Sequence, residues 1–239
     1  MPGRQIRQIQ LMPNTLKNKI CFFEQCSFYL YCITMGTAER KAKEKEDLKE
    51  MILQGAKKLF VEKGIEQTTI RNIADAISYS VGTVYVYFKD KNDILHELHT
   101  LGFIQLGAEM NILFNVADPM ERLKALGRVY INFALNNPDM YDLMFSLRAP
   151  MDFLEAQDKA DWPEGANAFD VLKTTVTQCI EAGYFSGLET EAASFMIWGT
   201  VHGMCALHIR DRIKGVNLHE PETMVTRAFE AFVKMIERR

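Results

Sequence analysis

The chain has 239 residues, of which 48% are hydrophobic and 25% charged, values that suit a soluble globular protein. No apolar run reaches the roughly 18 residues of a membrane span, and the five cysteines form no CxxC pair, which argues against structural zinc and disulfides. The formal net charge is −3, but residues 35–98 carry eleven basic and eleven acidic side chains, whereas residues 99–239 carry thirteen and nineteen. A DNA-binding face therefore remains possible in the first of these two segments.

Residues 1–34 show no helical period. Basic residues precede an apolar stretch, as in a signal peptide, but Glu24 and Gln25 interrupt that stretch and no small-residue cleavage site follows. Met35 then opens a charged run that is typical of an ordinary protein start. We therefore expect residues 1–34 to be disordered or to come from a start codon placed too early, with a functional extension as the alternative.

From Lys45 onward, apolar residues recur at three- and four-residue steps, which predicts an amphipathic helix. Gly64 is expected to end this helix, because glycine adopts the left-handed conformation that follows many helix C-termini. Thr68 and Thr69 then offer an N-cap for a short helix over Ile70–Ile77.

Ser80 is expected to cap a second short helix, Val81 to about Tyr87, and Asp90 a longer one with Asp93 in its first turn. Helices this short bury little surface alone, so we expect them to pack on the preceding helix as a three-helix core. The second short helix would then be free to enter a major groove of DNA. Gly82 has no side chain, which would let the backbone approach DNA closely.

A set of side chains in this segment follows a recognisable order and spacing. They are Ala56, Leu59, Phe60, Gly64, Thr68, Thr69, Ile73, Ala74, Ser80, Gly82, Thr83, Tyr85, Tyr87, Phe88, Lys91 and Leu95. The pattern resembles the DNA-binding region of TetR-family transcription regulators. The resemblance implies an all-α protein: an N-terminal three-helix helix-turn-helix domain over residues 35–98, and a helical ligand-binding and dimerisation domain over residues 99–239.

The resemblance also implies which residues contact DNA, through phosphates or through the base edges of the groove. The predicted residues are Thr69, Ser80, Val81, Gly82, Thr83, Tyr85, Tyr87, Lys91, Arg40 and Lys41. Arg40 and Lys41 would belong to a basic arm, for which the alternative is a solvated helix start. Two positions depart from the family pattern: Ile77-Ser78 stands where alanine-glycine is usual, and Val81 where a polar residue is common.

Residues 99–239 predict helices that are broken at proline- and glycine-containing sites, and no strand alternation or repeat is evident. The breaks fall at Asp118-Pro119, Asn137-Pro138, Ala149-Pro150, the loop around Trp162-Pro163, Gly187 and Pro221. The segment Thr190 to Arg210 is apolar nearly all round, which indicates burial on several sides. In TetR-like proteins the last two long helices form the dimer interface, and this segment and the last helix suit that role.

Two stretches, 137–145 and 198–207, resemble the WHG-type C-terminal domain of one branch of the family. The ligand-binding residues predicted from them are Tyr141, Met144, Phe145, Phe195, Trp198, His202 and Cys205. These side chains suit an apolar pocket with one polar handle. The alternative interpretation is an ordinary hydrophobic core around a hydrogen-bonded histidine.

No nucleophile motif or phosphate-binding loop is present, and His96 and His99 lack further residues to complete a metal site, so we expect no catalytic residue, metal or cofactor. The sequence therefore predicts a cytoplasmic, homodimeric repressor without a membrane partner. It would bind a palindromic operator in double-stranded DNA and be released by an unidentified small apolar effector. The alternatives are an all-helical adaptor, or an enzyme with a cavity near His202.

Overall fold

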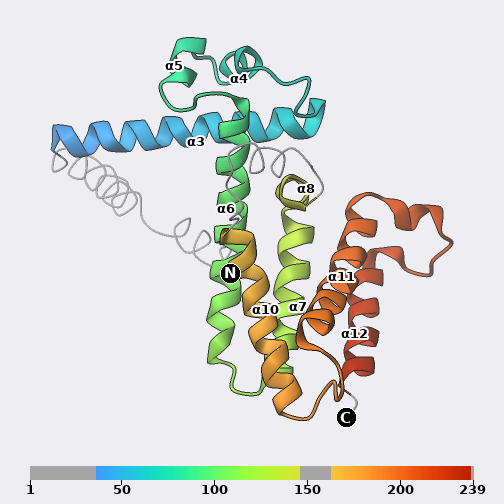
Figure 1. The fold of residues 1–239 in the computed structure, drawn as a ribbon. Helices are drawn as coiled ribbons and strands as arrows, with labels where there is room; N and C mark the ends of the chain where they lie inside the picture. Colours follow the sequence, from blue (N-terminus) through green and yellow to red (C-terminus); the bar gives the residue numbers. More distant parts are fainter. Residues whose placement is uncertain (1–35, 146–162, 238–239) are drawn as a thin grey trace, which may run out of the picture. The chain divides into compact units, whose positions relative to one another are not determined.

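The computed structural model describes residues 36–145 and 163–237, which form helices and connecting turns without a strand among them (Figure 1). The predicted all-α class is thereby confirmed. The expectations for residues 1–34 and for the breaks at Ala149-Pro150 and Trp162 lie outside the described residues. The chain divides into two units, one ending at Met51 and the other beginning at Ile52, and each is described by itself.

The described part of the first unit is the beginning of helix α3, which runs over Thr37–Lys63. This helix starts before the predicted Lys45, because the intervening residues are mostly alanine, glutamate, lysine and arginine, which favour helix. Arg40 and Lys41 are exposed, and Arg40 pairs with Glu44 one turn later at 3.7 Å.

The second unit begins with a helix-turn-helix segment, residues 52–98, which we call the head. It contains the end of α3, the short helices α4 (Ile70–Ala76) and α5 (Val81–Tyr85), and the start of α6 (Lys91–Asn111). Its core consists of Phe88, which lies between α5 and α6, and of side chains from all four helices, namely Ile52, Leu53, Ala56, Leu59, Phe60, Ile73, Ala74, Val84, Ile94, Leu95 and Leu98.

The helix boundaries of the head follow from local hydrogen bonds. Thr69, Ser80 and Asp90 are the N-caps of α4, α5 and α6, as predicted, and each side chain accepts a backbone N–H of the first turn. Gly64 has φ 81° where α3 ends, which is the left-handed conformation expected of it. Thr68 has a different role, because it is buried and its hydroxyl donates to the Gly64 carbonyl at 2.8 Å.

The remaining residues of the second unit, 99–237, form a helical segment that we call the body (Figure 1). Its elements are the rest of α6, η1 (Ile112–Asn115), α7 (Pro119–Asn136), α8 (Pro138–Phe145), α10 (Pro163–Glu181), α11 (Thr190–Ile209), η2 (Arg212–Gly215), η3 (Pro221–Thr223) and α12 (Met224–Ile236). The predicted breaks at Asp118, Asn137, Gly187 and Pro221 each fall at or between these elements. α10 packs against α6, α7 and α11, while α8 packs against α6 and α7.

Helix α11 is long and apolar enough to cross a membrane by length and composition alone, although fewer than a third of its residues are buried. In the fold it buries Val201 and Cys205 in the core of the body. The apolar residues on the inner side of α11 therefore pack in the core of the body, while further apolar residues on its outer side are exposed.

Candidate functional site

Helix α5 presents an almost bare backbone at its beginning. Ser80 accepts the Thr83 N–H at 3.0 Å, and the two hydroxyls lie 2.8 Å apart. Gly82, between them, is exposed, and a β-carbon there would contact only the Ser80 hydroxyl, at 3.7 Å. Because little side-chain volume stands in front of this turn, the α5 backbone can come close to a nucleic acid.

The predicted DNA-binding residues of the head divide by exposure. Thr69, Ser80, Gly82 and Tyr85 are exposed, with Tyr85 at 55%, while Val81, Thr83 and Tyr87 are half-buried. Val84, which directly precedes Tyr85, is fully buried and anchors α5 in the core of the head. Arg40 and Lys41 belong to the first unit.

Lys91 has a structural contact that the sequence did not indicate. Its ammonium group donates to the backbone carbonyl of Ile65 at 2.8 Å and lies 3.4 Å from that of Glu66. This contact ties the beginning of α6 to the turn between α3 and α4. The phosphate contact expected of Lys91 stays a prediction.

The turn between α4 and α5 contains the departure from the family pattern. Ser78 has φ 60°, and the N–H of Tyr79 donates to the Ala74 carbonyl at 3.0 Å, which closes α4. A left-handed φ costs a residue with a β-carbon free energy that glycine does not lose. The turn therefore has the geometry of the usual glycine with a serine in its place.

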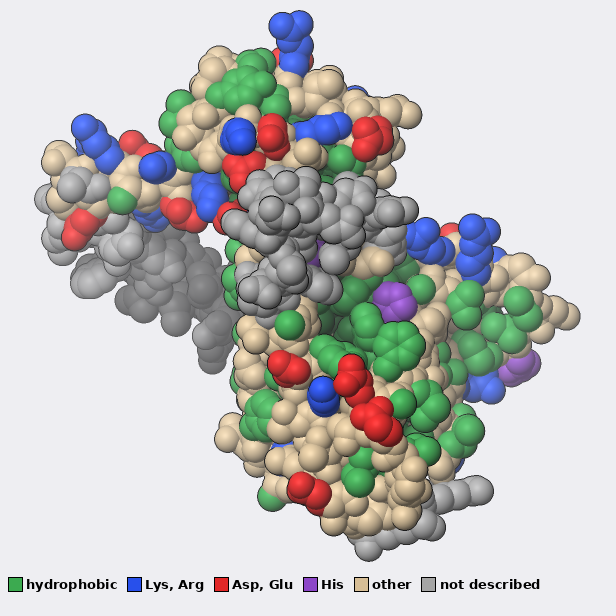
Figure 2. Space-filling model, in the orientation of Figure 1, with side chains coloured by type: hydrophobic (Ala, Val, Ile, Leu, Met, Phe, Trp, Pro, Cys, Tyr) green, Lys and Arg blue, Asp and Glu red, His purple; other side chains and the backbone are tan. Residues whose placement is uncertain are grey.

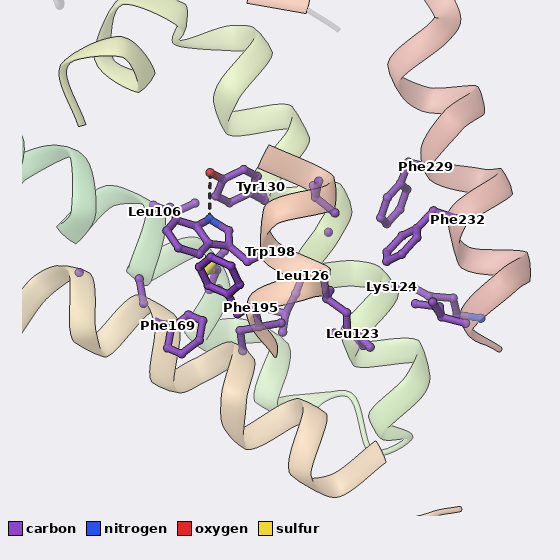
Figure 3. Close-up of a pocket in the computed structure, with 18 of the residues that line it drawn as sticks. Leu106, Leu123, Lys124, Leu126, Tyr130, Phe169, Phe195, Trp198, Phe229 and Phe232 are labelled. Atoms are coloured by element: carbon purple, nitrogen blue, oxygen red, sulfur yellow. Dashed lines mark hydrogen bonds between the residues drawn. The ribbon is translucent and has the colours of Figure 1, made fainter. Parts of the chain in front are cut away.

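The body contains an apolar cavity of about 620 Å³ that is partly open to solvent and is walled by side chains of α6, α7, α8, α10, α11 and α12. Phe169, Phe195 and Trp198 gather at one end of the close-up in Figure 3, and Phe229 and Phe232 at the other. The other wall residues are also mostly apolar, among them Phe103, Leu106, Met110, Leu123, Leu126, Tyr130, Phe145, Leu172, Ile197, Val201, Val233 and Ile236. A space of this size and lining is typical of small-molecule sites.

The predicted ligand-binding residues take three positions around this cavity. Phe145, Phe195 and Trp198 lie in its wall. Tyr141, Met144 and Cys205 are buried in the adjoining core, and burial raises the pKa of the Cys205 thiol to about 12. His202 is half-buried and does not line the cavity, but it is bonded to a residue that does.

That contact belongs to a small polar network behind the cavity wall. The Trp198 indole N–H donates to the Tyr130 hydroxyl at 3.3 Å (Figure 3), and this hydroxyl lies 2.9 Å from His202 Nδ1. The Tyr141 hydroxyl lies 2.7 Å from the same Nδ1 and donates to the His202 carbonyl at 3.1 Å. If Nδ1 is the acceptor, the hydroxyls of Tyr130 and Tyr141 and the indole N–H of Trp198 each have a partner to donate to.

Burial keeps the network uncharged. It lowers the pKa of His202 and raises the pKa values of Tyr130 and Tyr141, so that the neutral form of each is favoured. The cavity therefore offers hydrogen-bonding groups at one place on its wall, without a formal charge there.

Charged side chains on the wall have partners of opposite sign. Lys124 contacts Glu121 at 2.5 Å and Glu237 at 2.6 Å, and the hydrogen bond to Glu121 is the main cause that raises its pKa. Glu191 faces Lys173 at 3.6 Å. A ligand with a buried charge would have to compete with these pairs, so the cavity favours apolar ligands.

The described residues contain no group of three histidine, cysteine or carboxylate side chains placed to hold a metal ion. Residues that sequence reasoning missed include Phe103, Leu126, Phe169 and Phe229. Their spacing is that of any amphipathic helix, which does not separate a cavity wall from a filled core.

Two family models match the chain. Residues 52–98 match the model described as "Bacterial regulatory proteins, tetR family", and residues 123–232 match "Tetracyclin repressor-like, C-terminal domain". The two matches together cover more than half of the chain. The WHG-type assignment is finer than this description and stays a prediction.

Curated relatives agree with these models. The HTH-type transcriptional regulator AcrR of Shigella flexneri is 23% identical over 174 residues, which are 70% of this chain and 80% of AcrR. The HTH-type transcriptional repressor KstR2 of Mycobacterium tuberculosis is 34% identical over 77 residues, but that match spans only 31% of this chain and 38% of KstR2.

Solved structures have the same fold. The fatty acid degradation regulator FadR from Bacillus halodurans superposes with a TM-score of 0.63 at 21% identity, over 77% of this chain and 94% of FadR. FadR from Bacillus subtilis, solved in complex with stearoyl-CoA, gives 0.60 at 20% identity, over 77% and 97%. The chain thus belongs to the TetR family of DNA-binding transcriptional regulators.

Proposed function

We propose that this chain is a cytoplasmic repressor that binds a palindromic operator as a homodimer and is released when a small apolar molecule fills the cavity. The observation that carries the proposal is the course of α6. Near its beginning, Ile94, Leu95 and Leu98 are buried in the core of the head. Farther along, Phe103 and Leu106 line the cavity. One continuous helix therefore connects the DNA-binding surface to the ligand site.

The coupling follows from differential binding. A ligand that fills the cavity better when α6 has shifted would stabilise the shifted state and move the head with it. A coupling free energy of about 1–3 kcal/mol would weaken operator binding roughly 5- to 150-fold. Tight packing of α6 on α8 supports transmission, since a β-carbon at Gly102 would lie 2.5 Å from the Met144 sulfur.

The lining and volume of the cavity support an uncharged, largely hydrocarbon effector, or the hydrocarbon part of a larger one. The Bacillus subtilis FadR structure contains stearoyl-CoA, and its fold resembles this one. Long acyl chains are therefore the first compounds to test. Polar selectivity would come from the Tyr130 hydroxyl and the Trp198 indole, which meet at the cavity wall.

Two observations support the homodimer. TetR-family regulators are typically dimers, and the outer side of the last two long helices of this chain is apolar. Exposed apolar or small residues form one face of α11 and continue on α12, and hydrophobic side chains gather over these helices in Figure 2. They are Ala192, Phe195, Met196, Gly199 and Leu207 on α11, with the half-buried Gly203 between the last two, and Ala231 and Met235 on α12. A dimer would place two heads on successive major grooves, about 34–36 Å apart.

An enzymatic function is the weaker alternative. The titratable groups of the polar network beside the cavity are Tyr130, Tyr141 and His202, and they are hydrogen-bonded to one another and held neutral by burial, while the charged Lys124 and Glu191 of the wall are held in ion pairs. Such groups can orient a ligand, but they include no nucleophile activated by a base. We therefore infer a binding role for the cavity.

The test is operator binding by the full chain, measured by fluorescence anisotropy with DNA flanking its own gene across a salt titration. We expect specific, salt-dependent binding that Gly82→Asp abolishes, because a carboxylate would face the phosphates. Tyr85→Phe should weaken binding without changing specificity. Thr174→Asp adds the same charge at an exposed position of α10 and should leave binding unchanged. Specific binding that persists in Gly82→Asp would contradict the assignment of α5 as the recognition helix.

A further inference from the structure

Phe195 belongs to two surfaces at once. Its side chain lines the cavity and packs edge-on against the ring of Trp198, at 6.1 Å between ring centroids. The same side chain is 64% exposed. Its neighbour Ala192, one turn earlier on α11, is likewise both a wall residue and exposed. At this place the cavity wall is a single side chain thick, and within one chain its outer side faces solvent.

The exposed face of α11 continues from Phe195 without a charge. Gly199 and Gly203 follow at four-residue steps, and a β-carbon at either would meet nothing within 4 Å. Met196 and Leu207 flank the glycines and are 52% and 53% exposed. Small residues at four-residue spacing let a second helix approach closely, and large apolar side chains beside them supply surface to bury.

We propose that a second copy of this chain packs on this face of α11 and completes the cavity wall at Phe195. The inference rests on the proposed function, which supplies the dimer and the ligand site. A helix seated on Gly199 and Gly203 would cover Phe195, which lies one turn from Gly199 on the same face. The effector site would then be complete only in the dimer.

Two consequences distinguish this arrangement from a cavity closed within each chain. The monomer should bind an apolar ligand more weakly, because Phe195 loses its outer support and can swing away from Trp198. By reciprocity, each bound ligand should strengthen dimerisation by the same factor, so that the effect is squared when both sites of the dimer are filled. A cavity that is independent of the partner would show neither effect.

The experiment uses N-phenyl-1-naphthylamine, a neutral aromatic probe whose fluorescence rises in apolar sites, with the full chain. Gly203→Glu places a charge on the α11 face two turns from Phe195, at a residue that does not line the cavity. Glutamate favours helix more than glycine does, so the variant should fold. Gln105→Glu adds the same charge at an exposed position of α6 and is the matched control.

We expect sedimentation to show a dimer for the wild type and for Gln105→Glu, and a monomer for Gly203→Glu. Probe binding by the monomer should be at least tenfold weaker, with the helical circular dichroism spectrum unchanged. Diluting the wild type through its dimer dissociation range, with and without probe, measures the same linkage without a mutation. There the probe should lower the dimer dissociation constant.

Undiminished probe binding by the folded monomer would overturn the inference and leave the proposed function intact. A Gly203→Glu protein that stays dimeric would also overturn it, because the partner would then pack elsewhere. A wild-type dimer that binds no probe at all would refute the cavity as a ligand site, and with it both proposals. Failure of operator binding is measured separately and would refute only the DNA-binding part of the proposed function.

Discussion

The head and the body of this chain are built on different principles. The head is held together by contacts between neighbours in sequence, such as the caps at Thr69 and Ser80, around fully buried side chains such as Ile73 and Val84. The body brings together helices that are far apart in sequence, and it leaves a cavity of about 620 Å³ between them. A DNA-binding surface needs a fixed shape, which the filled core of the head provides. A ligand site needs space, which the cavity of the body provides.

The largest expected effect comes from deleting core volume in the head. Ile73→Ala removes three carbon atoms from a fully buried position and should lower the free energy of unfolding by about 2–5 kcal/mol. Because the head has so small a core, we expect it to unfold locally, so that operator binding is lost while the body still binds the apolar probe. Circular dichroism during urea unfolding, operator anisotropy and probe fluorescence measure the three quantities.

Ile104→Ala is the control for this change, because Ile104 is 55% exposed on α6 and its truncation should alter stability by less than about 0.5 kcal/mol. Equal loss of operator and probe binding in Ile73→Ala would show that the head and the body unfold together. The body would then not be stable independently of the head.

The second effect tests the space in the body. Gly127 lines the cavity, and a β-carbon there would meet the ring of Phe229, which lines it too. In Gly127→Ala the ring must turn, and part of the cavity is filled. We expect probe affinity to fall about tenfold, equivalent to about 1.4 kcal/mol, with operator affinity unchanged in the absence of ligand.

Gly107→Ala is the matched control, because a β-carbon at Gly107 meets nothing within 4 Å. Both changes replace a helical glycine by alanine and gain the same helix propensity. Unaltered probe affinity in Gly127→Ala would place the probe somewhere other than this cavity.

The same difference explains what could be predicted from sequence. The caps Thr69, Ser80 and Asp90 and the helix end at Gly64 were predicted correctly, because each depends on hydrogen bonds within a few residues. The partly buried hydrogen bond from Lys91 to the Ile65 carbonyl joins residues 26 positions apart, and no local pattern indicates it.

The cavity depends on tertiary packing, and its wall could be predicted only in part. Phe195 and Trp198 were expected at a pocket and do line the cavity, since α11 is apolar nearly all round. Phe229 and Gly127 were not predicted to line a pocket, because the sequence pattern of an amphipathic helix is the same whether its inner residues fill a core or line a cavity. Only the relative positions of α7 and α12 separate the two cases.

A smaller effect concerns the polar network of the body and its dependence on pH. Burial lowers the pKa of His202 below the value of about 6.5 that it has in the unfolded chain. Between the two pKa values the unfolded chain binds a proton that the folded chain does not, so stability is fully present above pH 6.5 and falls as the pH falls. The free energy of unfolding should decline less between pH 7.5 and 5.5 in His202→Gln than in the wild type.

His219→Gln is the control for the pH series, because the His219 side chain is 84% exposed. Urea unfolding at several pH values supplies the measurement. An identical pH dependence in the wild type and His202→Gln would show that His202 has the same pKa in the folded and the unfolded chain, so that burial does not disfavour the charged imidazole there.

The smallest expected effect concerns the turn between α4 and α5 in the head, where a serine adopts a backbone conformation that favours glycine. Ser78 has φ 60°, a conformation that costs a residue with a β-carbon about 1–2 kcal/mol relative to glycine. Ser78→Gly removes this strain, but glycine also loses more backbone entropy on folding, which offsets about 0.4–1 kcal/mol of the gain. We expect a net increase in stability of about 0.5 kcal/mol, measured by urea unfolding, with operator affinity changed less than twofold.

Ala76→Gly, two residues earlier at an exposed helical position, is the control and should destabilise the head by a similar amount, because there glycine relieves no strain. If Ser78→Gly instead weakened operator binding while raising stability, the strained turn would be positioning α5 for DNA, and the head would share with the body the property of giving up stability for function.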